Sequence, residues 1–99
     1  MKRLIGKTAY EVHWQSPRTG YDCLLGGSNN ISDANRIAKN QAKEIFDNPW
    51  ETAEDKFKFL DSMYVLNTAS EDADCMDLET EEYVDNLMSQ LDSQIVKKK

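Results

Sequence analysis

The sequence predicts an α+β fold in which an N-terminal β-hairpin packs on three α-helices. Two short segments of alternating apolar residues come first, and three longer segments with apolar residues at helical spacing follow. Loops that contain glycine or proline separate the earlier segments. The 99 residues fit one domain, so we predict a single domain over 1–99, with flexible termini at 1–6 and 97–99.

The hairpin is predicted from the segments YEVHW and YDCLL. Between them, Pro17 suits position i+1 of a type I turn, and Gly20 suits the left-handed residue that closes such a loop. If Gln15 pairs with Gly20, one face of the hairpin carries three apolar pairs. These pairs are Trp14–Tyr21, Val12–Cys23 and Tyr10–Leu25. A lone hairpin is marginal in water, so this face must pack on the helices.

The first helix is predicted to be capped by Ser32 and to stop at Asn48, because a residue before proline is pushed out of helical geometry. Its apolar stripe consists of Ala34, Ile37, Ala38, Ala42, Ile45 and Phe46. Asn48 is then expected to cap a second helix, with Pro49 at its first position. The stripe of that helix consists of Trp50, Ala53, Phe57, Leu60 and Tyr64.

The stretch SMYVLNT is ambiguous, because Tyr, Val and Thr favour a strand. One prediction extends the second helix to Met63 or beyond. The alternative is a ββαβα order with a third strand near residues 62–67. An acidic linker over 67–78 follows, and from about Glu79 the chain is predicted to be helical again. The stripe of that last helix consists of Val84, Leu87, Met88, Leu91 and Ile95.

Charge is divided unequally along the chain. Residues 1–43 hold seven basic and three acidic side chains, a local charge of +4, whereas residues 44–96 hold two basic and fifteen acidic ones, a local charge of −13. The overall charge of −6 argues against general binding to nucleic acid or to anionic membranes. Two cysteines at unrelated positions, no visible signal peptide and no long apolar run predict a cytoplasmic protein without a membrane segment.

The most unusual stretch is SEDADCMDLETEEYVD, residues 70–85, in which eight of sixteen positions are acidic and none is basic. Acidic residues at a helix start stabilise the helix by ~0.3–1 kcal/mol, which accounts for only part of this run. The remaining unpaired charge predicts a binding surface for a cationic partner. Its candidate partner-binding residues are Glu71, Asp72, Asp74, Asp77, Glu81 and Asp85.

These acidic residues do not form a calcium loop. Counted from Asp72, the position that needs glycine is Asp77, and the position that needs a bidentate glutamate is Tyr83. We predict neither a metal site nor a cofactor.

A catalytic site is not predicted either. His13, the only histidine, is expected beside Asp22, but Cys23 points to the opposite face of the hairpin and no other nucleophile is near. Among its acidic neighbours, Cys75 is expected to have a raised pKa, which disfavours the reactive thiolate.

The first functional hypothesis is therefore an acidic inhibitor that occupies a basic, nucleic-acid-binding groove of a host enzyme. In size and charge the chain is similar to small anti-restriction and anti-CRISPR proteins of phages and mobile elements; this is a likeness of type, and no family motif is matched. A second hypothesis is a homo-oligomerising module, such as a homodimer. A third is a nucleic-acid binder that uses the hairpin and the following helix, with Arg18, Arg36, Lys39 and Lys43 as contacts.

Overall fold

The computed structural model describes residues 8–97 and confirms the predicted α+β class. The elements are β1 (Tyr10–Gln15), β2 (Asp22–Ser28), α1 (Ile31–Phe46), α2 (Ala53–Asp61), β3 (Tyr64–Asn67) and α3 (Leu78–Lys97). The structure thus combines the three predicted helices with the third strand of the alternative. Of the two predicted flexible termini, 1–6 and 98–99 lie outside the described residues, and Lys97 is the last residue of α3.

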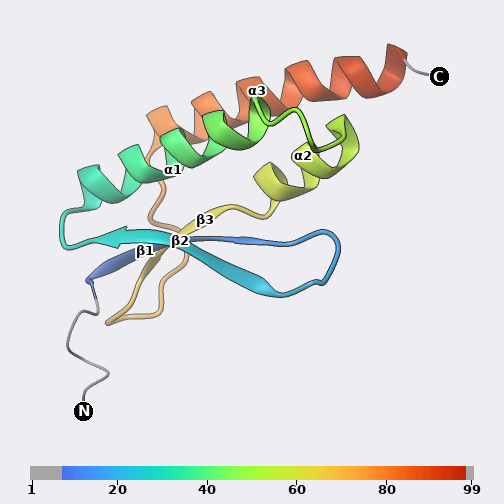
Figure 1. Ribbon diagram of the computed structural model, residues 1–99. Coiled ribbons are helices and arrows are strands. Elements are labelled where there is room, and N and C mark those ends of the chain that lie inside the picture. The colour runs from blue at the N-terminus through green and yellow to red at the C-terminus, as the bar shows by residue number, and fades with distance from the viewer. Residues whose placement is uncertain (1–7, 98–99) are drawn as a thin grey trace.

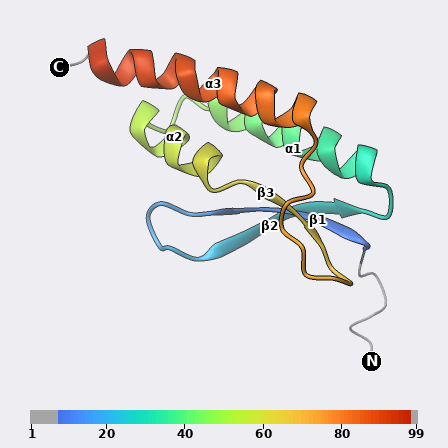
Figure 2. The ribbon, with the colours of Figure 1, turned by 180° about the vertical axis from the view of Figure 1, so that it is seen from behind.

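The helices cover one face of a three-stranded antiparallel sheet with the order β2-β1-β3 (Figure 1). Helix α1 packs against β1, β2 and α3. Helix α3 packs against α1 and α2, and within the described elements it packs on no strand. The view from behind shows the same layers, with α3 farthest from the sheet (Figure 2). Much of the surface of this acidic helix therefore stays open to solvent.

The hairpin pairs in a different register from the predicted one. The closing hydrogen bond runs from the Ser16 amide to the Tyr21 carbonyl at 2.9 Å, so Gln15 pairs with Asp22 instead of Gly20. Gly20 has the predicted left-handed conformation, with φ of 77°. The observed partners of the apolar residues are Trp14–Cys23, Val12–Gly26 and Tyr10–Ser28, with a register shift between Val12 and His13. The loop closes one residue later on each strand, which moves the register by two and keeps each residue near the loop on its predicted face.

The apolar face of the sheet forms the core with the helices, as predicted. Val12 and Val65 are paired across β1 and β3, and both are fully buried. Trp14 is also buried and lies against Phe59 with ring centroids 4.8 Å apart. Tyr21 was expected on this face but lies in the loop, and 75% of its surface is exposed.

Both predicted helix caps are wrong by a few residues. Asn30, and not Ser32, caps α1: its side chain accepts hydrogen bonds from the amides of Ser32 and Asp33. Thr52, and not Asn48, caps α2 by accepting from the Asp55 amide at 3.1 Å. Because α2 begins after Thr52, Trp50 lies outside the helix and is 87% exposed instead of belonging to its apolar stripe.

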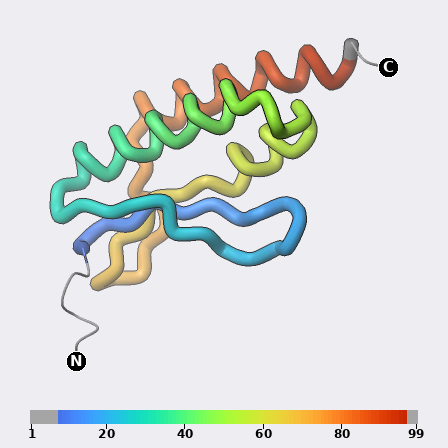
Figure 3. Tube along the Cα trace, in the orientation of Figure 1, coloured from blue at the N-terminus to red at the C-terminus, as the bar shows by residue number. Residues whose placement is uncertain are grey.

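The extension of the second helix to Met63 or beyond is also wrong, because α2 ends at Asp61. The Gln15 amide donates to the Ser62 hydroxyl at 2.8 Å, which ties the end of the helix to β1. The chain then continues as β3, which pairs with β1. Figure 3 traces this return of the chain from α2 to the sheet and its departure along α3.

The segment between β3 and α3 runs back along the outer edge of β3. Val65 forms a parallel bridge with Asp74, and Asn67 forms an antiparallel bridge with Asp72. The Asn67 amide donates to the Asp72 carbonyl at 2.8 Å, and the Cys75 amide donates to the Val65 carbonyl at 3.2 Å. The acidic segment is thus held against the sheet by backbone hydrogen bonds.

A buried asparagine in α1 anchors the end of this segment. Asn35 is 2% exposed, and its side-chain amide donates to the carbonyls of Ile31 at 2.9 Å and Cys75 at 3.3 Å. Its side-chain oxygen accepts from the Asp77 amide at 2.8 Å. One side chain therefore satisfies two backbone groups just before α3, which would otherwise lack a partner among the described residues.

We predict that Asn35→Ala lowers the free energy of unfolding by roughly 2–4 kcal/mol, because the Cys75 carbonyl and the Asp77 amide lose their hydrogen-bond partner. The matched control is Asn40→Ala, in the same helix but exposed, which should change stability by less than about 0.5 kcal/mol. Urea unfolding measures both variants. Equal losses for the two would contradict the anchoring role of Asn35.

Candidate protein-binding groove

Two adjoining hollows lie between α2 and α3. The larger one, of about 330 Å³, is bounded by the end of α2, the start of β3, residues 73–76 and the first half of α3. The second, of about 320 Å³, lies between Phe57 of α2 and the middle of α3. The two hollows share Asp85 and Met88, so we treat them together as the acidic groove.

Five carboxylates line the acidic groove, and among the described residues no lysine, arginine or histidine does. They are Asp61, Asp74, Glu81, Asp85 and Asp92. Glu81 and Asp85 lie one turn apart on α3, where like charges destabilise a helix by a few tenths of a kcal/mol. The groove therefore concentrates negative charge without local compensation.

Apolar side chains also line the acidic groove, and they are more buried than most of its carboxylates. Met63, Met76 and Met88 line the larger hollow together with Leu60 and Val84, and Phe57 lines the smaller one. Methionine is flexible and polarisable, so it adapts to the shape of whatever lies on it. The groove thus joins an adaptable apolar floor to an anionic rim.

The structure divides the six predicted partner-binding residues into two sets. Asp74, Glu81 and Asp85 line the acidic groove. Glu71, Asp72 and Asp77 are exposed but lie outside its lining. The Asp72 carboxylate accepts from the Asp74 amide at 3.0 Å, so it also shapes the segment along β3.

Asp77 has a structural role at the start of α3. Its carboxylate accepts from the Thr80 amide at 2.8 Å, and its carbonyl accepts from the Glu81 amide at 2.9 Å. The nearby Thr80 hydroxyl, the Thr80 amide and the charge of Lys39 lower the pKa of the Asp77 carboxyl. The Thr80 hydroxyl oxygen itself is buried and meets no partner with good hydrogen-bond geometry. Asp77 is therefore the N-cap that starts the groove-lining helix.

The site contains residues that the sequence analysis did not select. Asp61 and Asp92 belong to its rim, and the methionines form its floor. Asp92 lies seven residues after Asp85, a helical repeat that could have shown it on the same side of α3. Nothing local in the sequence brings Met63, Met76 and Met88 together, because the fold unites three separate segments.

The four basic residues of the nucleic-acid-binding hypothesis are all in ion pairs. Arg18 contacts Glu51 at 2.6 Å and Lys39 contacts Glu79 at 3.4 Å. The two other pairs are Arg36–Asp33 and Lys43–Asp47. Trp14, an aromatic residue of the hairpin that would have to be exposed to stack on bases, is buried. This pairing reduces the positive field of the first half of the chain, whereas the acidic groove keeps its charge.

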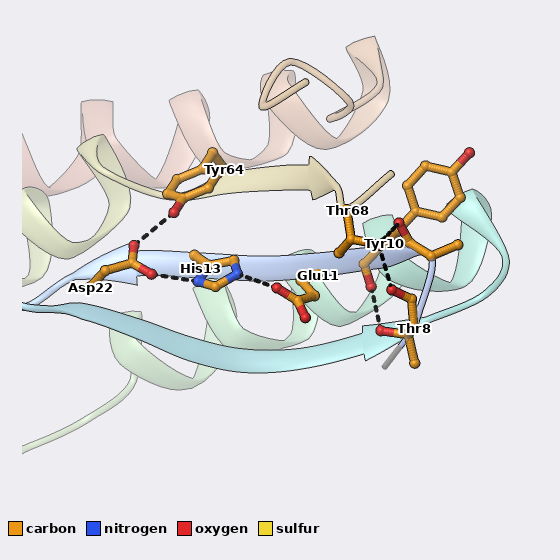
Figure 4. A network of polar contacts seen from close by, with 8 residues as sticks. Thr8, Tyr10, Glu11, His13, Asp22, Tyr64 and Thr68 are labelled. Atoms are coloured by element: carbon orange, nitrogen blue, oxygen red, sulfur yellow. Dashed lines mark hydrogen bonds and ion pairs between the residues drawn. The ribbon is translucent and has the colours of Figure 1, made fainter. Parts of the chain in front are cut away.

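The outer face of the sheet holds a polar network centred on His13 (Figure 4). Nδ1 of His13 lies 2.6 Å from the Asp22 carboxylate and Nε2 lies 2.9 Å from the Glu11 carboxylate. The Tyr64 ring stacks on the imidazole with centroids 5.1 Å apart, and its hydroxyl donates to Asp22 at 2.8 Å. The predicted His13–Asp22 contact is confirmed, although the two residues are not direct strand partners.

This network joins all three strands and leaves His13 poorly placed for catalysis. Both ring nitrogens already contact carboxylates, and only 11% of the side-chain surface is exposed. Cys23 lies on the opposite face of the sheet from His13, as expected, although its strand partner is Trp14 and not Val12. The network therefore links β1, β2 and β3 through side-chain contacts.

Other candidate sites are limited within the part of the chain that the structure describes. Burial, followed by the charge of Asp72, raises the pKa of the Cys75 thiol, which agrees with the expected low reactivity. No group of three or more His, Cys, Asp or Glu side chains in residues 8–97 is placed to hold a metal ion. Among the described helices, none has the length and apolar content to cross a membrane.

Comparison of the chain with protein-family models, curated proteins and solved structures gives no match. The fold and the groove therefore define the class of protein: a small acidic α+β protein with an anionic, methionine-floored groove.

We predict that Asp77→Ala destabilises the protein by about 1 kcal/mol at neutral pH, because α3 loses its N-cap. The folded-state pKa of Asp77 is lowered, so its contribution is complete above the unfolded-state pKa and is lost as the pH falls through the folded-state pKa. In urea unfolding, the variant and the native protein should differ in free energy of unfolding by about 1 kcal/mol at about pH 7 and by less at about pH 2.5. An equal difference in free energy of unfolding at both pH values would contradict the role of the Asp77 carboxylate as a charged N-cap.

We also predict that Tyr64→Phe removes a pH dependence at the alkaline end. Burial, followed by the hydrogen bond to Asp22, raises the pKa of Tyr64 to about 12. Its contribution to stability is therefore complete below the unfolded-state pKa of about 10 and is lost as the pH rises through the folded-state value.

Between about pH 9 and about pH 11 the native protein should lose more stability than the Tyr64→Phe variant, measured by urea unfolding. Tyr21→Phe, at an exposed tyrosine, is the control and should leave the native pH dependence unchanged. Parallel curves for the native protein and Tyr64→Phe would rule out the raised pKa.

Proposed function

We propose that this protein binds the basic, nucleic-acid-binding groove of a host enzyme and inhibits that enzyme by occupying the groove. The observation that carries the proposal is the acidic groove, in which five carboxylates and an apolar floor occur together and no basic residue of the described part of the chain lines the site. Self-repulsion among these charges costs stability, so their retention favours a use for the field they create.

The distribution of ion pairs supports a role for this particular surface. Residues 61–96 contain ten acidic side chains and no basic one. Within the described residues, the salt bridge from this set is the Glu79–Lys39 pair. Arg18, Arg36 and Lys43 pair instead with acids that lie before residue 61. An approaching cationic surface therefore meets its strongest attraction at α3 and the segment before it.

The charge density of the groove is lower than that of a nucleic acid duplex. Glu81 and Asp85 are about 6 Å apart along the α3 axis, whereas duplex DNA carries one charge per ~1.7 Å with both strands counted. The exposed acids outside the groove add to the field: Glu71, Asp72, Asp77, Glu79 and Glu82. The proposed imitation is thus of an anionic surface and not of the phosphate spacing of a duplex.

The size and charge of the chain support a host defence nuclease as the enzyme, in the manner of the small anti-restriction and anti-CRISPR proteins. Binding to nucleic acid itself is disfavoured, because Arg18, Arg36, Lys39 and Lys43 are already paired with carboxylates.

A second candidate function is self-association through β2. This strand is at one end of the sheet order, and Leu24 on it is 61% exposed. Another copy pairing with this edge would give a homodimer. Sedimentation at low and high salt separates the candidates, because edge pairing depends weakly on salt and leaves the acidic groove open.

The proposal is tested by capturing proteins from a bacterial lysate on the immobilised chain. At about 0.05 M salt we expect enrichment of nucleic-acid-binding enzymes, which added duplex DNA displaces and about 1 M salt releases, because the Debye length falls from above 10 Å to about 3 Å. The variant Glu81→Lys/Asp85→Lys should lose this capture.

The matched control is Glu44→Lys/Glu54→Lys, which changes the net charge equally at exposed positions outside the groove and should retain most of the capture. The proposed function would be wrong if the amount of captured enzyme changed neither with salt, nor with added DNA, nor in the Glu81→Lys/Asp85→Lys variant.

A further inference from the structure

We propose that the acidic groove is a receptor for arginine side chains of the partner, with each aliphatic stem on the methionine floor and each guanidinium on the carboxylate rim. This inference rests on the proposed function and deepens it, because it names the chemical group that the groove accepts.

The geometry of the larger hollow favours an elongated cationic side chain. Its lining comes from the end of α2, the start of β3, the segment before α3 and α3 itself. Asp74, Glu81 and Asp85 stand on its rim, while Met63, Met76 and Met88 line it. Apolar and anionic groups therefore occur together in about 330 Å³, a space for a side chain or a short run of side chains.

The smaller hollow continues the same chemistry along α3. It shares Asp85 and Met88 with the larger one and adds Asp92 to the rim and Phe57 to the apolar lining. From Glu81 to Asp92 the helix rises by about 16 Å, so successive cationic side chains of one segment can reach different carboxylates. The aromatic ring of Phe57 also offers a face for cation–π contact.

Arginine fits both parts of this lining better than other occupants. A purely apolar ligand would bury carboxylates without partners, which is costly. Lysine carries a compact, strongly hydrated charge, whereas the guanidinium is planar, is weakly hydrated and forms two parallel hydrogen bonds to a carboxylate. The arginine stem also packs on apolar surface while its head stays at the rim. Charge and shape therefore select arginine over lysine.

Arginine is also a side chain that a nucleic-acid-binding groove presents. Such grooves contact phosphate oxygens through arginine and lysine, and bidentate recognition of phosphate favours arginine. Arginines that normally meet phosphates can meet Asp74, Glu81 and Asp85 instead. This gives the proposed inhibitor a specific point of attachment beyond its overall charge.

The test measures binding of a fluorescent oligo-arginine peptide and an oligo-lysine peptide of equal length by anisotropy. The native protein should bind the arginine peptide more tightly. Glu81→Gln/Asp85→Asn should weaken that binding by about tenfold or more, because it removes charge-assisted hydrogen bonds. The control Glu71→Gln/Glu82→Gln removes the same charge outside the groove and should weaken it by less than about threefold.

A third variant tests the floor without changing any charge. Met76→Gln/Met88→Gln should reduce the preference for arginine over lysine, with thermal unfolding recorded to confirm that the variant is folded. If this variant does not fold, the comparison of the two charge-neutralising variants still decides the outcome.

Equal weakening by the groove pair and the control pair, or no preference for arginine, would overturn the arginine receptor. In that case the proposed function is decided separately, by whether the protein captures an enzyme that added duplex DNA displaces. Selective peptide binding without such capture would instead remove the inhibitor function and leave the arginine receptor in place.

Discussion

The arrangement of the acidic half of the protein depends on the buried side chain of Asn35. From α1 it holds the Cys75 carbonyl and the Asp77 amide, and so it fixes the chain on both sides of Met76. Asp77 then caps α3, which sets where that helix begins and where its carboxylates face. The Val65–Asp74 bridge fixes the same segment to the sheet from the other side. The wall of the acidic groove is thus built from polar contacts that the apolar core alone would not specify.

Much of the fold could be predicted from the sequence, because periodicity reports which side of an element is buried. Val12 and Trp14 alternate onto the core face, and Ala34, Ala38 and Ala42 line the buried side of α1. The details that failed depend on competing local choices. Either Asn30 or Ser32 can cap a helix, and the hairpin loop can close at Gln15–Gly20 or at Ser16–Tyr21 with the same face alternation. The third strand was ambiguous because its strand preference competes with a helical repeat, and its pairing with β1 decides the outcome.

The candidate site was predictable in charge but not in shape. The acidic run pointed to Asp74, Glu81 and Asp85, and the structure places these three on one groove. The sequence could not separate them from Asp77, because an N-cap and a binding residue look alike in a linear pattern. Nor could it foresee the floor, since Met63, Met76 and Met88 come from different segments that meet only after α2 and α3 pack together. A polar residue at a core-facing position of a helix, such as Asn35 three residues before Ala38 and seven before Ala42, was the available sign of a buried anchor.

The backbone pairing of the acidic segment with β3 also limits the growth of the sheet. An unpaired strand invites a strand from another molecule, and such pairing leads to aggregation. At β3 that position is taken by Asp72 and Asp74, whose exposed carboxylates repel a second chain of the same charge. Residues that make the surface anionic thereby also act as gatekeepers, because their like charge disfavours the pairing of a second copy along this side of the sheet.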